Sequence, residues 1–154
     1  MPVASQIVVD FIQTVKGDPE RLVLIVGKPG SGKSKIMREL ATNRGWKYVD
    51  SQDLVTAELL ELVPKARPRE APHLLDDMLS KEKAEVILLD GIQLFFTPLL
   101  NLDPLALLRQ LSKKHLIVAA WPGRYESGRL SFLEPGRAEP YYYAAKDIKL
   151  IEID

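Results

Sequence analysis

Apolar side chains recur every three to four positions along several stretches of the chain, which is the spacing of one face of an α-helix. The clearest stretch predicts a helix over Ala4–Val15. Four further helices are expected, over Ser34–Ala41, Leu54–Leu62, His73–Ser80 and Asp103–Ser112. Asp103 is a favourable N-cap residue, and Pro104 suits a first turn. Lys65–Pro72 holds four charges and two prolines, so we expect a surface loop there.

Five short, largely apolar runs predict strands: Leu22–Val26, Trp46–Val49, Glu85–Leu89, Leu116–Ala120 and Ile148–Ile153, the last at a sheet edge. Beyond Trp121, glycine and proline interrupt the chain, and Leu130–Leu133 is expected to be a short strand in a hairpin-like excursion. Strands and helices alternate, which predicts an α/β fold: a three-layer αβα sandwich with a mainly parallel, five-stranded sheet. A single domain is expected over residues 1–154.

Composition excludes several classes of protein. Lys and Arg number 21 and balance 21 Asp and Glu, unlike the strong positive charge of a dedicated nucleic-acid module. The absence of cysteine excludes disulfides, thiolate nucleophiles and Cys-based zinc sites. Residues 1–11 lack the pattern of a secretory signal, and no apolar run approaches the ~18 residues of a membrane span. We expect a cytoplasmic protein without a membrane partner.

One segment matches a phosphate-binding pattern in full: Gly27-Lys28-Pro29-Gly30-Ser31-Gly32-Lys33-Ser34 fits G-x-x-x-x-G-K-[ST], between a predicted strand and a predicted helix. The glycines let the backbone curl so that N–H groups point at phosphate oxygens, and the helix adds its positive end. Lys33 is expected to reach the β- and γ-phosphates, and the Ser34 hydroxyl to ligate Mg²⁺. We expect ATP, with GTP left open, to bind Gly27, Lys28, Pro29, Gly30, Ser31, Gly32, Lys33, Ser34 and Lys35.

A carboxylate follows the apolar run Val86–Leu89 at Asp90. The carboxyl end of a central strand lies beside the phosphate loop, so Asp90 is expected to hold Mg²⁺ with Ser34 and to act with Lys33 in catalysis. A turn-forming Asp is the alternative. Gly91 stands where ATPases of the additional-strand type carry a Glu that polarises the attacking water. Slow hydrolysis, or a site completed by another subunit, follows as a hypothesis.

Other residues have both a functional and a structural interpretation. Gln93 and Asp50 are candidates for orienting a water, although Asp50 is better explained as a cap. Trp121 occupies the position of a γ-phosphate sensor, but a packing role is expected. Surface roles are favoured over arginine-finger roles for Arg109, Arg124, Arg129 and Arg137. Packing or a subunit contact is favoured over base stacking for Tyr141–Tyr143, and a solvated face for Lys35, Arg38, Arg44 and Lys47.

Two resemblances carry these expectations further. The loop Gly27–Ser34 and the segment Ile87–Gln93 resemble the additional-strand P-loop ATPases, near the AAA+ branch. The stretches Leu102–Arg109, Val118–Gly123 and Gly128–Gly136 resemble the small P-loop proteins of BREX (type 3) phage-defence systems, the BrxF family. This resemblance implies ATP binding, a bacterial anti-phage role and other BREX proteins as partners. No C-terminal helical lid of the AAA+ type is expected after the last strand, which argues against an autonomous ring motor.

Three functions follow from these observations. The leading one is an ATP-binding, slowly hydrolysing component of a BREX-type complex, whose assembly, including homo-oligomerisation, is controlled by nucleotide. DNA contact is expected only through that complex. A small-molecule kinase is an alternative, in which Asp50 and Asp53 would bind a hydroxyl acceptor and Arg124–Arg137 would form a lid. A non-hydrolysing, nucleotide-gated scaffold is a further alternative, favoured by Gly91.

Overall fold

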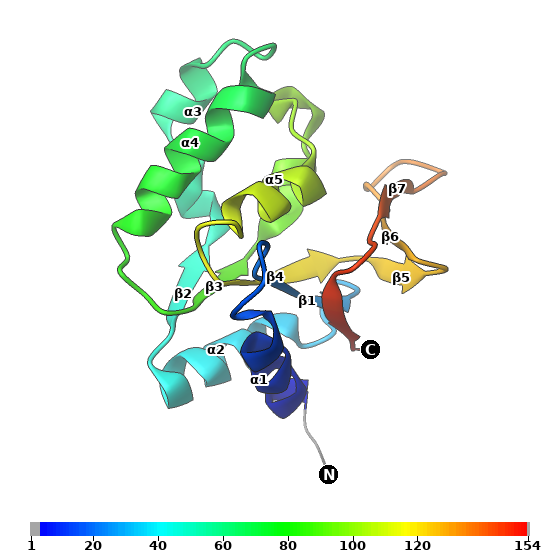
Figure 1. Ribbon diagram of the computed structural model, residues 1–154. Helices are drawn as coiled ribbons and strands as arrows, with labels where there is room; N and C mark the ends of the chain where they lie inside the picture. The colour runs from blue at the N-terminus through cyan, green and yellow to red at the C-terminus, as the bar shows by residue number, and fades with distance from the viewer. Residues whose placement is uncertain (1–3, 154) are drawn as a thin grey trace.

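The main sheet of the computed structural model, which describes residues 4–153, has five strands in the order β2-β3-β4-β1-β8 (Figure 1). Every pairing in this sheet is parallel. The bounds are β1 Leu22–Gly27, β2 Lys47–Asp50, β3 Ile87–Asp90, β4 Ile117–Pro122 and β8 Lys149–Glu152. The predicted five-stranded sheet is therefore confirmed, with its last strand at an edge.

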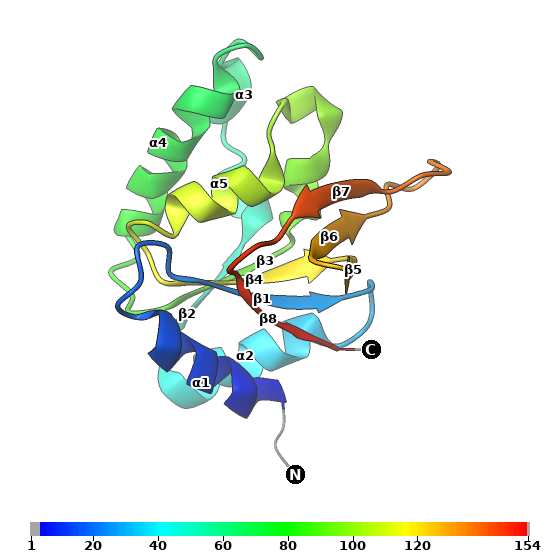
Figure 2. The same cartoon turned by 45° about the vertical axis from the view of Figure 1, so that its right-hand side comes forward.

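Helices cover both faces of this sheet and complete the three predicted layers (Figure 2). One face carries α1 and α2, and the other carries α4 and α5. The bounds are α1 Ala4–Val15, α2 Lys33–Arg44, α3 Ala57–Glu61, α4 Arg67–Ser80 and α5 Pro104–Leu111. Short 3₁₀ turns are η1 Ser51–Leu54, η2 Ile92–Phe96 and η3 Pro98–Leu100.

Strand β1 is an interior strand of the main sheet, and all of its residues are buried. Leu24 pairs with Ala119 of β4 on one side and with Leu150 of β8 on the other. Its side chains alternate between two cores: Leu24 packs on the α4–α5 side, whereas Val23 and Ile25 pack on the α1–α2 side. A strand covered on both faces needs an unbroken apolar sequence, as Leu22–Val26 has. The loop that follows β1 therefore begins from a rigid, fully buried support.

A second sheet interrupts the chain between β4 and β8. Strands β5 Arg124–Glu126, β6 Arg129–Phe132 and β7 Tyr141–Ala144 pair antiparallel in the order β5-β6-β7. The predicted strand over Leu130–Leu133 is confirmed as β6, but β5 and β7 were not foreseen. Leu130 and Phe132 are buried in the same core as Leu24 and Trp121, so the inner face of this sheet belongs to the main packing unit.

The predicted surface loop over Lys65–Pro72 is wrong, because α4 begins at Arg67. Pro68 stands in the first turn, where its missing N–H costs little. The Arg67 side chain is only 6% exposed and donates hydrogen bonds to the carbonyls of Leu59, Leu60 and Leu99. The density of charged residues suggested an exposed loop. One of them, Arg67, is instead buried and links α4 to α3 and η3.

Other differences concern element boundaries. The predicted helix over Leu54–Leu62 is divided: Leu54 ends η1, and α3 starts after Thr56, whose hydroxyl accepts from the N–H of Leu59. Helix α2 continues to Arg44 and ends at Gly45, which has a φ of 71°. The predicted start of α5 is confirmed, since the Asp103 carboxylate accepts from the N–H of Ala106. In the described part of the chain, no helix is long and apolar enough to cross a bilayer.

Candidate nucleotide site

The phosphate loop joins β1 to α2 at the carboxyl edge of the main sheet (Figure 1). Gly30 and Gly32 have φ angles of 82° and 105°, in the left-handed region that favours glycine. Gly32 is the N-cap of α2 and has no side chain that could accept a hydrogen bond from the first turn. The N–H groups of that turn therefore have no side-chain cap. These N–H groups and the positive end of the helix dipole are features that favour the binding of an anion.

Lys33 lies under this loop and is 9% exposed. Its Nζ donates to the carbonyl oxygens of Gly27 at 2.6 Å and Lys28 at 2.8 Å. Burial lowers the pKa of Lys33, and the nearby negative charge of Asp90 opposes that shift. The ammonium is thus held by backbone acceptors at the point where the motif predicts contact with phosphate.

Ser34 and Asp90 meet as predicted. The Ser34 hydroxyl donates to Asp90 Oδ2 at 2.6 Å, and the N–H of Gly91 donates to Asp90 Oδ1 at 2.9 Å. Strand β3, which carries Asp90, is separated from β1 by β4. Asp90 and Ser34 therefore meet although β3 is not a direct neighbour of β1, the strand that precedes Ser34.

Tyr48 of β2 completes this cluster and was not singled out from the sequence. Its hydroxyl donates to Asp90 Oδ2 at 2.6 Å, and the Arg38 guanidinium lies 5.2 Å from its ring centroid. Burial, together with the hydrogen bond to Asp90, raises the pKa of Tyr48, while Arg38 opposes the shift. No local signal could reveal Tyr48, because its contact depends on how β2 pairs with β3.

The oxygen donors of Ser34 and Asp90 fit Mg²⁺, which prefers hard oxygen ligands and usually takes only one or two from protein beside substrate phosphates. Among the described residues there is no group of three or more His, Cys, Asp or Glu side chains arranged for a metal. The donor set therefore suits a cation shared with phosphate rather than a closed protein cage.

The candidates for orienting a water are placed differently. Asp50 accepts from the N–H of Gln52 at 2.9 Å and caps η1, as expected. Gln93 is exposed and lines the cavity beside the loop. Glu85 pairs with Lys16 before the start of β3, at the edge opposite to the loop. Gly91 has a φ of 72°, a conformation that a side chain disfavours.

Trp121 is fully buried. Its indole N–H donates to the Ser131 carbonyl of β6 at 2.9 Å, and its ring packs edge-on against Phe96 and Tyr143. Trp121 therefore connects β4 to the second sheet, in agreement with a packing role.

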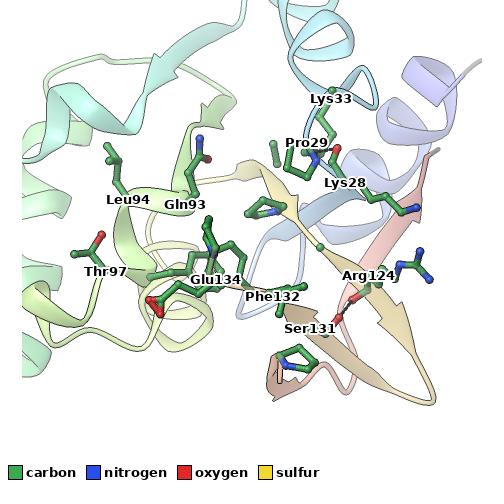
Figure 3. A pocket seen from close by; sticks show the side chains of 18 of the residues that line it. Lys28, Pro29, Lys33, Gln93, Leu94, Thr97, Arg124, Ser131, Phe132 and Glu134 are labelled. Atoms are coloured by element: carbon green, nitrogen blue, oxygen red, sulfur yellow. Dashed lines mark hydrogen bonds between the residues drawn. The ribbon is translucent and has the colours of Figure 1, made fainter. Parts of the chain in front are cut away.

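A cavity of about 1010 Å³ extends from the loop to the second sheet. Figure 3 shows Lys28, Pro29 and Lys33 on one side, with Arg124, Ser131 and Phe132 on another. Its far wall is largely apolar and comes from η2, η3 and the β6–β7 connection, through Leu94, Phe96, Pro98, Phe132, Leu133, Pro135 and Pro140. Glu134 also lines this wall and was not considered from the sequence.

The arginine candidates have distinct surroundings. Arg109 is tied to Glu20 at 2.8 Å and to the Lys146 carbonyl, so it is a paired residue rather than a free surface cation. Arg129 stacks over Tyr142 at 4.2 Å, and Arg137 over Tyr141 at 4.0 Å. Arg124 is exposed and lines the cavity together with Lys28. Of the four, Arg124 is the one that lines this cavity.

The basic group on the surface of α2 and β2 is spread over separate contacts. Lys35 and Arg38 are exposed along α2, Arg44 stacks with Trp46, and Lys47 pairs with Glu82. These contacts agree with the solvated face that we expected. The part assigned to Lys35 in nucleotide binding stays a prediction.

No protein-family model matches the chain, and no curated protein matches its sequence. Solved structures of similar fold include AMPPCP-bound DnaA from Aquifex aeolicus, at 16% identity and a TM-score of 0.38, over 79% of this chain and 40% of that chain. A DNA replication initiation factor matches at 17% identity and a TM-score of 0.42, over 100% of this chain and 47% of that chain. C. elegans PCH-2 matches at 15% identity and a TM-score of 0.42, over 97% of this chain and 40% of that chain. This chain thus spans less than half of each of these proteins.

Proposed function

We propose that this protein binds ATP·Mg²⁺ on the loop Gly27–Ser34 and hydrolyses it slowly, if at all, when alone. The observation that carries the proposal is the 2.6 Å contact between Ser34 Oγ and Asp90 Oδ2, directly beside Lys33 and the curled loop. Two segments that are far apart in the sequence, Gly27–Ser34 and the end of β3, supply these groups, and a glycine-rich turn that merely resembles the motif would not bring them together.

Each residue has a definite part in this proposal. Backbone N–H groups of the loop and of the first turn of α2 donate to phosphate oxygens. Lys33 exchanges its bonds to the Gly27 and Lys28 carbonyls for bonds to phosphate, so its charge is already positioned. Ser34 and Asp90 would hold Mg²⁺, which neutralises phosphate charge when bound.

The proposal of slow hydrolysis rests on the residues next to the expected position of the γ-phosphate. Gly91 provides no carboxylate, and the Trp121 N–H is already used by Ser131. The cavity wall opposite the loop is largely apolar, so it orients a water poorly. Gln93, Arg124 and Glu134 are polar residues of the cavity lining that could act in one chain, and a second subunit or a partner would supply what is lacking.

We further propose, from the family resemblance alone, that the protein is a cytoplasmic component of a BREX-type phage-defence complex. In this proposal ATP binding favours assembly, either between copies of this chain or with other BREX proteins. Contact with DNA would occur through the assembled complex, since the chain has balanced charges.

The test measures ATP·Mg²⁺ binding and phosphate release over a wide range of protein concentration. Lys33→Ala is expected to weaken binding roughly 10- to 100-fold, because several charge-assisted hydrogen bonds are lost. Lys113→Ala is the matched control, since Lys113 is exposed just beyond α5. Turnover per subunit that rises with concentration supports completion between subunits. Equal binding by wild type and Lys33→Ala would refute the proposed site.

The scaffold and kinase alternatives are distinguished by different results. Tight binding without phosphate release, with or without partners, indicates a scaffold. A phosphorylated acceptor in a metabolite screen indicates a kinase, although its predicted acceptor residues do not line the cavity: Asp50 caps η1, and Asp53 lies in a separate depression with Lys47 and Glu82. The kinase would therefore need to bind its acceptor on the apolar wall.

A further inference from the structure

The carboxylate of Asp90 is held from three directions. Ser34 Oγ and the Tyr48 hydroxyl both donate to Oδ2 at 2.6 Å, whereas the N–H of Gly91 donates to Oδ1. Two hydroxyl protons on one carboxylate oxygen fix both the position and the rotation of the carboxyl group. Ser34 is accounted for by the phosphate motif, but Tyr48 is not.

The pairing of β2 with β3 explains why Tyr48 reaches this carboxylate. Tyr48 is paired with Leu88, and Asp90 lies two residues farther along β3. Residues two apart on a strand share a face, and this diagonal distance can be spanned by a long aromatic side chain. Helix α2 covers the same face, and Ser34 in its first turn donates to the same carboxylate.

We infer that Tyr48 is a positioning residue for the metal site: it holds the Asp90 carboxylate where that group and Ser34 share Mg²⁺. This inference rests on the proposed binding of ATP·Mg²⁺. A serine hydroxyl that donates its proton to Asp90 keeps its lone pairs for a cation. Tyr48 donates to the same oxygen as Ser34 and so holds the carboxylate against turning towards solvent. Oδ1 accepts one bond, from the Gly91 N–H, and keeps a lone pair for the cation.

Residues that hydrogen-bond to a metal-binding carboxylate have a measurable effect on metal affinity. Their removal typically lowers metal affinity or activity about 10- to 100-fold. Tyr48→Phe removes only the hydroxyl, because the ring remains to pack on the α1–α2 side of the sheet beside Leu88 and Met37. Phenylalanine keeps the ring that the Arg38 guanidinium faces, but it loses the interaction of Arg38 with the hydroxyl.

The experiment titrates Mg²⁺ against the binding of a fluorescent ATP analogue to the full chain. We expect Tyr48→Phe to raise the Mg²⁺ concentration at half-maximal binding roughly tenfold. Binding of the analogue in excess EDTA should be the same as for wild type, because phosphate contacts with the loop are unaffected. Tyr142→Phe is the matched control, since the Tyr142 side chain is exposed on β7. Thermal melting of each variant reports its folding.

A double-mutant cycle with Asp90→Asn separates positioning through Asp90 from any other effect. If Tyr48 acts through Asp90, then Tyr48→Phe shifts the Mg²⁺ midpoint in wild type but not in the Asp90→Asn background. An unchanged midpoint in wild type, or an equal shift in both backgrounds, overturns the inference while leaving ATP binding established. Absence of analogue binding by wild type at every Mg²⁺ concentration instead refutes the proposed function, and the inference with it.

Discussion

Gly123 allows the backbone of β4 to approach β6 more closely than any other residue type would permit. A Cβ atom at this position would lie 1.8 Å from the Ser131 carbonyl oxygen and 3.1 Å from Trp121 Nε1. Both neighbours are fixed, since Ser131 is backbone in a paired strand and Trp121 is fully buried. Gly123→Ala must therefore displace β6 from the end of β4.

The expected loss of stability has two sources. Overpacking of a dense interior costs about 1–3 kcal/mol. Displacement of Ser131 also breaks its bond with the Trp121 N–H and leaves a buried donor unpaired, at about 1–3 kcal/mol. A single small displacement of β6 would reduce both the overpacking and the loss of the hydrogen bond, so the two costs are not fully additive. We therefore expect Gly123→Ala to lower the free energy of unfolding by about 3 kcal/mol. For a domain of this size, that lowers Tm by roughly 6–12 °C.

Chemical denaturation, followed by tryptophan fluorescence and by circular dichroism, measures this change. Gly17→Ala is the control, because no heavy atom lies within 4 Å of a Cβ built there and its change should stay within about 0.5 kcal/mol. A Gly123→Ala variant as stable as the control would refute the reasoning. It would mean that the second sheet detaches from β4 without cost, and that the apolar wall of the cavity is not fixed.

Two further predictions test other buried groups. Arg67→Met should lower the free energy of unfolding by about 2–4 kcal/mol in the same assay, because three carbonyls lose a buried donor; a change below about 0.5 kcal/mol would contradict this. Burial lowers the pKa of His115, with Asp76 opposing, so the folded state binds its proton less readily than the unfolded chain. The stability that neutral His115 contributes is present above about pH 6.5 and is lost as the pH falls through the folded-state value. Between pH 7.5 and 5.5, wild type should therefore lose stability more steeply than His115→Gln, and parallel curves would contradict this.

The sequence predicted best those segments that must satisfy a single physical requirement, such as burial on both faces of a strand or a positive φ angle in a loop. Strand β1 is buried on both faces, so its pattern has a single interpretation, and the loop after it needs glycine at particular φ angles. The nearness of Ser34 and Asp90 also followed, because parallel strands bring their carboxyl ends to one edge.

What could not be predicted depends on contacts between distant segments. The buried position of Arg67 depends on carbonyls from α3 and η3. Tyr48 reaches Asp90 only through the register of β2 and β3. Strands β5 and β7 are short and rich in exposed polar or aromatic residues, so their pairing with β6 leaves little trace in the local pattern.

Both strands that pair with β1, which carries the phosphate loop, follow much later in the chain. Its neighbours, β4 and β8, begin at Ile117 and Lys149, whereas β1 ends at Gly27. At the usual pace of synthesis, the last neighbour emerges roughly 6–24 s after β1. Both edges of β1 stay open until β4 has emerged, and the edge that β8 covers stays open until the end of this interval. An apolar strand with an open edge is prone to pairing with another chain. The site therefore closes late in biosynthesis, and nascent chains interrupted before β8 should aggregate rather than bind nucleotide.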